Sequence, residues 1–144
     1  METTQDYTIS IPLETSKQEL FSALNENLGQ WWGTISNSNF KEGGRFTVTF
    51  ENDYWWTFQI LEFTPNEELI WKCIDGEPDF NKEWIGHVLH WSIIEVNHKT
   101  VLKFHQAGLN PTVDCYEICS TTWDRFLVKE LKQFLAQRNL PKLN

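Results

Sequence analysis

The chain has few of the residues that build disulfide scaffolds or basic binding surfaces. Its 144 residues include only 3 Cys, and 12 Lys and Arg stand against 20 Asp and Glu. An odd, small number of cysteines predicts reduced thiols and not a disulfide framework. The formal net charge of -8 repels phosphate backbones and anionic lipid surfaces, so nucleic acid is excluded as an expected partner.

Long apolar runs are also missing. No stretch approaches the ~20 apolar residues that cross a bilayer, so membrane insertion is not expected. The first residues, METTQDYT, lack the basic start and apolar run of a signal peptide, which predicts a cytoplasmic location. Without linkers or internal repeats, residues 1–144 are expected to form one domain.

What the chain does contain is large aromatic side chains. There are 8 Trp, 10 Phe and 3 Tyr, or 15% of the sequence, although hydrophobic residues as a whole reach only 40%. The apolar mass is therefore concentrated in a few large rings, which dominate core energetics wherever they are buried.

The first third of the chain predicts a strand followed by a helix. Residues 7–11 alternate apolar and polar side chains up to Pro12, as a half-buried strand does. Ser16 and Glu19 form a capping box, and apolar residues then recur at helical spacing as far as residue 28. The Trp31-Trp32 pair falls on a short connection or single helical turn.

From about residue 40 to 107 the pattern changes to strands joined by turns. The expected strands are 45–50, 55–60, 69–73, 84–96 and 100–105, with turns at Asn52-Asp53, Thr64 to Glu67 and Asn97-His98, and a polar loop from Asp75 to Glu83. Sequential hairpins of this kind predict an antiparallel meander.

The last third predicts one long helix, from Thr112 to Arg138. Its apolar face consists of Tyr116, Cys119, Trp123, Phe126, Leu127, Leu131, Phe134 and Leu135. A helix of ~24 residues is about 36 Å long, the span of a small domain, so it must lie across the sheet. The order β-α-α-β-meander-α is an α+β architecture, with a curved antiparallel sheet wrapped around the C-terminal helix.

This order of elements, together with several local strings, resembles the START/Bet v 1-like (SRPBCC) superfamily. The resemblance is strongest to the branch named after the activator of Hsp90 ATPase, and it runs from about Tyr7 to Leu135. The strings that carry it are Ile9-Ser10-Ile11-Pro12, the Trp31-Trp32 pair, Phe40-Lys41-Glu42-Gly43-Gly44-Arg45-Phe46, Ile60-Leu61-Glu62-Phe63-Thr64-Pro65, Glu68-Leu69-Ile70-Trp71, the segment from Thr100 to Leu109, and Trp123.

The resemblance implies a helix-grip fold with an internal cavity for apolar small molecules. Members of the superfamily include lipid carriers, cyclases, stress-response proteins and co-chaperone domains, and fold alone does not choose among them. We expect this chain to bind an apolar or amphipathic small molecule or lipid between its sheet and its last helix. An Hsp90 co-chaperone-like interaction domain, a cyclase- or hydrolase-like enzyme and a homodimer remain alternatives.

The candidate ligand-binding residues are those on the predicted inner faces. They are Trp31, Trp32, Phe46, Phe50, Trp56, Phe58, Trp71, Trp84, His90, Phe104, Trp123 and Phe126. Their indole N–H groups could fix the polar end of a ligand. The alternative is that the same rings fill a solid core, and for any single ring core packing is favoured.

Signals for catalysis and metal binding are weaker. The acid or base candidates nearest the expected cavity are His90, Glu62, His105 and Asp114, and alternation along the strand turns His90 inward. His87 and His90 would face opposite sides of a strand and cannot share an ion. Cys115 and Cys119 share a helix face and are interpreted as buried structural thiols. No catalytic residue, cofactor or metal is predicted.

Overall fold

The main feature of the fold is a seven-stranded antiparallel sheet. The computed structural model describes residues 5–138 of the chain. The strands are β1 (Tyr7–Leu13), β2 (Thr34–Ser36), β3 (Arg45–Thr49), β4 (Trp55–Thr64), β5 (Glu68–Glu77), β6 (Val88–Val96) and β7 (Lys99–Ala107). Their order in the sheet is β1-β7-β6-β5-β4-β3-β2. The predicted meander is confirmed, and the first strand closes its far edge by pairing with the last.

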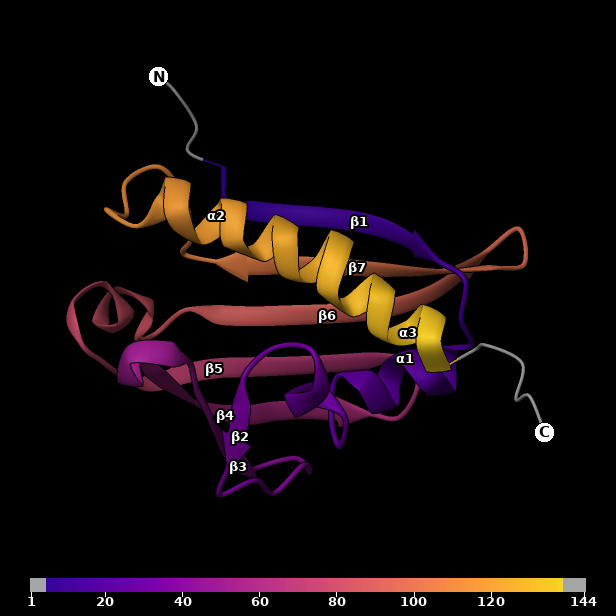
Figure 1. Ribbon diagram of the computed structural model, residues 1–144, viewed down its shortest axis with the longest axis horizontal. Helices are drawn as coiled ribbons and strands as arrows, with labels where there is room; N and C mark the ends of the chain where they lie inside the picture. Colours follow the sequence, from indigo (N-terminus) through magenta and orange to yellow (C-terminus); the bar gives the residue numbers. More distant parts are fainter. Residues whose placement is uncertain (1–4, 139–144) are drawn as a thin grey trace.

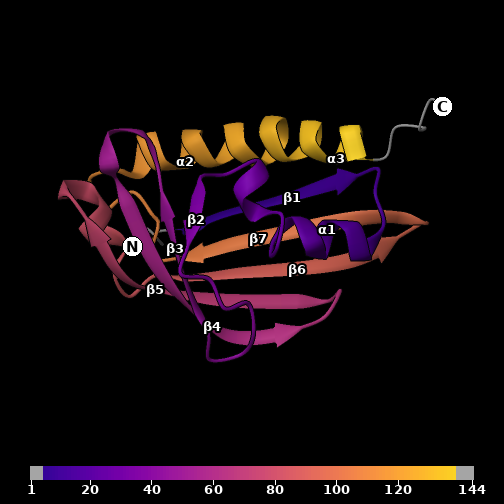
Figure 2. The same cartoon turned by 60° about the horizontal axis from the view of Figure 1, so that its bottom comes forward.

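The helices lie on one face of this sheet (Figures 1 and 2). Helix α1 (Lys17–Ala23) is followed by the short 3₁₀ turns η1 (Leu28–Gln30), η2 (Glu51–Asp53) and η3 (Asp79–Trp84). The C-terminal helix runs without a break through α2 (Tyr116–Asp124), η4 (Arg125–Leu131) and α3 (Lys132–Arg138). It crosses the sheet diagonally, so the predicted α+β helix-grip architecture is confirmed.

Hydrogen bonds in and after the first helix fix the position of the Trp31-Trp32 pair. The Glu19 N–H donates to Ser16 Oγ at 3.0 Å, as the capping box predicts. Helix α1 ends at Ala23, earlier than its apolar spacing suggests, and the Ala23 carbonyl accepts the indole N–H of Trp31 at 2.7 Å. This bond fixes the connection from which Trp32 enters the interior.

Several boundaries differ from the sequence expectation. Strand β2 was not predicted, because three residues are too few to show alternation. Strand β4 continues to Thr64 and β5 through Glu77. Much of the expected polar loop is the 3₁₀ turn η3, which includes Trp84, so the strand expected from residue 84 begins only at Val88. The last helix begins at Tyr116 and not at Thr112, whose N–H instead donates to Asn110 Oδ1 at 3.0 Å in a turn.

The middle of the C-terminal helix is a π-helix, in η4. The buried side chains of the whole helix are spaced by four: Cys119, Trp123, Leu127, Leu131 and Leu135. In an α-helix, residues four apart drift by about 40° per step, or about 160° over four steps. The wider π turn offsets that drift, which keeps this stripe of side chains facing the sheet along the whole helix.

The stripe predicts a sharp contrast between two adjacent residues. Leu127 is fully buried and Val128 is 48% exposed. Leu127→Ala should lower the free energy of unfolding by about 2–5 kcal/mol, because it leaves a cavity between helix and sheet. Val128→Ala should change it by no more than about 0.5 kcal/mol. Urea denaturation measures both, and similar values for the two variants would contradict the described packing.

Candidate functional site

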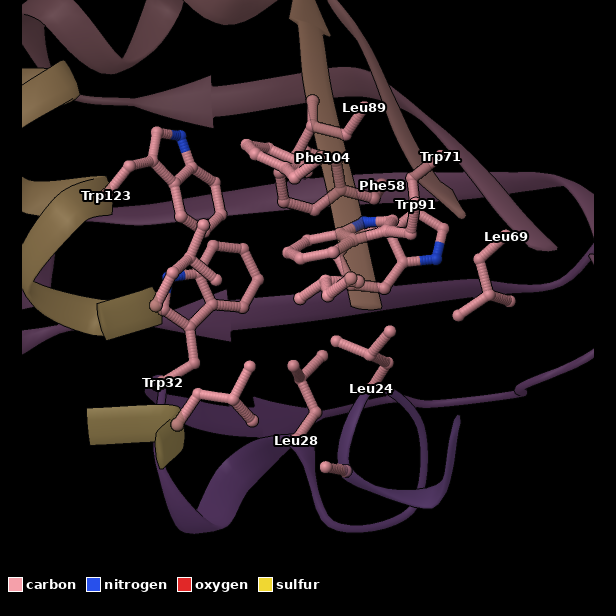
Figure 3. Packing of buried hydrophobic residues seen from close by; sticks show 14 of the residues in the cluster. Leu24, Leu28, Trp32, Phe58, Leu69, Trp71, Leu89, Trp91, Phe104 and Trp123 are labelled. Atoms are coloured by element: carbon pink, nitrogen blue, oxygen red, sulfur yellow. The ribbon is translucent and has the colours of Figure 1, made fainter. Parts of the chain in front are cut away.

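The space between the sheet and the middle of the helix is filled by aromatic rings. Phe46, Phe58, Trp71 and Phe104 are at most 1% exposed. Their rings touch one another and their neighbours, with centroids 4.8 Å apart for Phe46 and Trp71 and 4.2 Å apart for Trp91 and Phe104. Figure 3 shows sheet residues and Leu24 and Leu28 meeting in the same interior. For this part of the chain, the expected hollow is a solid core.

A smaller hollow remains at the end where the C-terminal helix begins. It measures about 200 Å³ and lies among α2, η3 and the start of β4. We call it the aromatic pocket, and its walls are Trp32, Phe50, Tyr54, Trp56, Asn81, Trp84, Ile118, Cys119, Thr122, Trp123, Arg125 and Phe126.

Indole rings line the pocket with their planes nearly parallel. Trp56 and Trp84 stack at 4.0 Å with 14° between their planes, and Trp84 and Trp123 lie at 5.9 Å with the same angle. Trp32 continues the series at 5.3 Å from Trp123 and 22°. The labelled rings of Trp32 and Trp123 approach one another in Figure 3. Rings at these distances stack on one another, so together they form a continuous wall of the pocket and leave no space for a further ring between them.

The same walls contain buried polar atoms without a partner. Asn81 is fully buried, and its amide donates to the Trp55 carbonyl at 3.1 Å while its backbone carbonyl accepts the Trp56 indole N–H at 2.8 Å. Within the described residues, Asn81 Oδ1 and the Trp84 indole N–H have no hydrogen bond. Unpaired buried groups cost stability wherever they occur, and the described core contains others, on Asn25, Trp71 and Trp91.

A buried polar chain holds Trp123 in place. The Trp123 indole N–H donates to Gln106 Oε1 at 2.8 Å, and Gln106 Nε2 lies 2.9 Å from His87 Nδ1. An indole nitrogen can only donate, so the Gln106 amide must present its NH₂ to His87. His87 Nδ1 is therefore an acceptor, and the imidazole is neutral with its proton on Nε2. Burial lowers the pKa of His87, in agreement with this tautomer.

Gly108 makes room for this imidazole. Its φ is 106°, and a Cβ at this position would overlap the His87 ring. Only glycine combines that backbone conformation with that contact.

The structure divides the candidate residues into three groups. Trp32, Phe50, Trp56, Trp84, Trp123 and Phe126 line the aromatic pocket. Trp31, Phe46, Phe58, Trp71 and Phe104 are buried in the core around it. His90 lies apart from both groups.

The expectation that His90 points inward is wrong. Its strand neighbours Leu89 and Trp91 are fully buried, so alternation places His90 on the opposite, solvent-facing side of the sheet. There its Nε2 lies 2.8 Å from Glu68 Oε2. The inward assignment failed because β6 has half-buried apolar residues on its outer face too, which hides the true register.

The other acid or base candidates do not gather at the pocket either. His105 is on the outer face, 3.4 Å from Asp6, and Asp114 is exposed in the loop before α2. Glu62 follows a register shift in β4, and it is not among the described residues that line the pocket.

Sequence reasoning missed part of the pocket wall. Ile118, Thr122 and Arg125 follow one another at helical spacing on the side of the helix next to the buried stripe, and Cys119 belongs to the stripe itself, so helical spacing could have found them. No sequence signal pointed to Asn81 or Tyr54, since both come from turns whose folding brings them to the helix.

Two further properties concern the described residues as a whole. Between residues 5 and 138, no group of three or more His, Cys, Asp or Glu side chains is placed to hold a metal ion. Nor is any helix in that range long and apolar enough to cross a membrane.

A long helix held in a curved antiparallel sheet, with a pocket at one end, defines the class of helix-grip, START/Bet v 1-like proteins. Within this class, the family described as Activator of Hsp90 ATPase homolog 1-like protein matches residues 14–136. The chain belongs to that family, which confirms the resemblance read from its sequence.

Solved structures agree with this assignment at the level of the fold. The Aha1 dimer from Colwellia psychrerythraea is 23% identical with a TM-score of 0.76, covering 90% of this chain and 95% of that one. A protein from Mesorhizobium loti is 18% identical with a TM-score of 0.77, covering 93% and 100%.

DynU16, from the dynemicin biosynthetic locus, is 16% identical with a TM-score of 0.72, and the match covers 91% of this chain and 47% of that one. No curated protein matches the chain in sequence.

The neutral state of His87 predicts how stability depends on pH. Its folded pKa lies below the ordinary value of 6.5, so below about pH 6.5 the unfolded chain binds more protons than the folded one. The free energy of unfolding should therefore fall as pH drops from 7.5 to 5.5. His87→Gln can still accept from Gln106 and should reduce this slope.

Urea denaturation at the two pH values measures the effect. His98→Gln, in the exposed turn after β6, is the matched control and should keep the wild-type slope. An unchanged slope in His87→Gln would show that His87 does not couple protonation to folding.

Proposed function

We propose that the aromatic pocket binds a small, flat, apolar or amphipathic molecule. The observation that carries the proposal is a hollow of about 200 Å³ whose wall is built largely from indole and phenyl rings and includes Arg125. The rings supply apolar contact, and Arg125 supplies a polar group that orients the ligand.

The size of the pocket limits the ligand. An apolar cavity of ~150 Å³ is enough to hold benzene, so about 200 Å³ suits a one- or two-ring compound. A long lipid chain would need more room than the pocket itself offers.

The mouth of the pocket favours a polar substituent on the ligand. Arg125 and Phe126 line both the pocket and a neighbouring surface groove, and Phe50 lies between the two hollows. The Arg125 guanidinium sits 5.0 Å above the Phe126 ring and forms no ion pair with the described carboxylates. A ring bound in the pocket could therefore place a carboxylate or hydroxyl group beside Arg125.

Family and fold support a binding role in general terms. The helix-grip fold is a ligand-binding fold, and one structural neighbour, DynU16, comes from a biosynthetic locus. Among the acid or base candidates from the sequence, none lines the pocket. The geometry therefore favours binding over a cyclase- or hydrolase-like reaction.

Family membership favours a second candidate, the docking of an Hsp90-type chaperone. Docking of this kind would use the surface of the domain and would not require the pocket. A pull-down with the host's Hsp90, together with an assay of its ATPase activity, separates the two roles, provided that pocket variants are tested in parallel.

Two adjacent threonines provide a matched test of the pocket. Thr122 lines it, whereas Thr121 is exposed on the same helix. With 2-naphthol and indole as probes, calorimetric titration of the wild type should give dissociation constants of about 10 μM to 1 mM, or roughly -4 to -7 kcal/mol. Thr122→Phe fills the pocket and should weaken binding at least tenfold, while Thr121→Phe should not.

The outcomes distinguish the alternatives. Equal weakening by both variants would place the probes elsewhere on the molecule, and saturable binding to neither probe by the wild type would reject the proposal. Stimulation of the chaperone's ATPase that is unaffected by Thr122→Phe would favour docking as the main role.

A further inference from the structure

His87 lies directly behind the wall of the aromatic pocket. Its side chain is buried and is not among the described residues that line the pocket. Its ring stacks on that of Trp84, with centroids 6.4 Å apart and 21° between the planes. Through Gln106 it is also joined to Trp123 by two buried hydrogen bonds. Two of the indoles in the pocket wall are therefore in contact with, or bonded through one amide to, the same titratable group.

The hydrogen bonds of this chain are consistent only with a neutral imidazole. Trp123 Nε1 can only donate, so Gln106 Oε1 must face it, and the Gln106 NH₂ must face His87 Nδ1. Protonation of His87 adds a proton at Nδ1, where the facing group is already a donor. Two donors would then oppose one another across the 2.9 Å between His87 Nδ1 and Gln106 Nε2.

Rotation of the Gln106 amide transfers this conflict to the pocket wall. The rotated amide presents Oε1 to the protonated imidazole, which satisfies the charged group. Its NH₂ then faces the indole N–H of Trp123, so the indole loses its acceptor. Because Gln106 is fully buried and Trp123 is 2% exposed, bulk water cannot replace the lost bond. A charged His87 and a hydrogen-bonded Trp123 therefore exclude one another.

The imidazole has little room to relieve the conflict by moving. Trp84 stacks beside it, and a Cβ at Gly108 would lie only 2.4 Å from His87 Cδ2 and 2.7 Å from Nε2. The two ends of the Gln106 amide are nearly equal in size, and one terminal torsion exchanges them. The smallest motion that satisfies a charged His87 is thus in Gln106, and its effect falls on Trp123.

The charged groups that act on His87 come from two other segments. Glu83, in η3, and Asp6, ahead of β1, both favour its protonation, while burial is the larger effect and lowers its pKa. The carboxylate of Glu83 accepts backbone N–H groups at the start of α2, and that of Asp6 accepts a side-chain amide. From β7 and α2, the groups that hold His87 are the neutral side chains of Gln106 and Trp123.

We propose that ligand binding in the aromatic pocket is linked to the protonation of His87, with Gln106 and Trp123 as the positioning residues that connect the two. The inference rests on the proposed binding function and adds a regulation of that site. A ligand that packs on the Trp123 ring binds the state in which this ring is anchored, so it favours a neutral His87. Binding of the ligand and binding of the proton then oppose one another reciprocally.

The sign of the effect follows from the direction of the shift. In the free folded protein the pKa of His87 lies below 6.5, so the ring is neutral at pH 7.5 and the affinity for a ligand has its full value. A bound ligand lowers this pKa further. As pH falls through the pKa of the free protein, affinity decreases, by at most about tenfold per pH unit for a single proton.

Calorimetric titration of the wild type with 2-naphthol, at several pH values from 7.5 to 5.0, tests the linkage. The probe is uncharged across this range, so it contributes no titration of its own. The dissociation constant should be unchanged above about pH 6.5 and should rise at least about threefold by pH 5.0. A constant value would overturn this inference and leave the proposed function standing, whereas absence of binding at pH 7.5 would reject both.

Nuclear magnetic resonance of the ligand-free wild type follows the same switch without a probe. The nitrogen chemical shifts of His87 report its tautomer and its titration midpoint, and the indole N–H resonance of Trp123 reports its hydrogen bond. At pH 7.5 the imidazole should carry its proton on Nε2, and the indole resonance should move with the same midpoint as His87. An indole resonance that does not respond to the protonation of His87 would overturn the proposal.

Matched variants separate His87 from other groups that titrate. His87→Gln has no titratable ring and should bind 2-naphthol equally at pH 7.5 and 5.0. Gln106→Glu offers a carboxylate that accepts from both neighbours, so it should also remove the loss of affinity at pH 5.0. His98→Gln, in the exposed turn after β6, should keep the wild-type dependence. A loss that persists in His87→Gln would overturn the proposal, and the resonance measurement on the wild type decides the question if a variant does not fold.

Discussion

The indole of Trp123 joins the C-terminal helix to the sheet, and the rest of the structure depends on this contact. Its N–H is fixed by Gln106, which is in turn fixed by His87, and its ring packs against Trp32, Trp84 and Phe104. One side chain therefore belongs at once to the buried polar chain, the core and the wall of the pocket. Because the indole N–H of Trp123 can only donate a hydrogen bond, it sets the orientation of the Gln106 amide, and through that amide the tautomer of His87.

This arrangement explains how a chain with 15% aromatic residues and 40% hydrophobic residues builds its interior. Towards the middle of the helix, the rings pack against one another at angles from 30° for Phe46 and Phe58 to 76° for Phe46 and Trp71. The hollow lies towards the start of α2, where the indoles meet a loop and a helix end. The same amino-acid types therefore serve as solid core and as pocket, and the segments that pack around them decide which.

Much of the fold could be predicted from the sequence because strand alternation, the capping box at Ser16 and the helical stripe around Trp123 are local signals. The pocket could be predicted only in part. Trp32, Trp84 and Trp123 were recognisable as large rings on inner faces, but whether a ring lines a hollow or fills it depends on packing between distant segments. Asn81 reaches the pocket through the fold of η3, and His90 was misplaced because both faces of β6 carry apolar residues.

The central claim is that a flat molecule occupies the space between the helix and the indoles. It is tested most directly by intermolecular nuclear Overhauser effects between bound 2-naphthol and the isotope-labelled protein. The account predicts contacts from the ligand ring to the methyl groups of Ile118 and Thr122, which line the pocket. Contacts confined to exposed apolar residues outside the pocket, such as Leu61 or Val96, would contradict it.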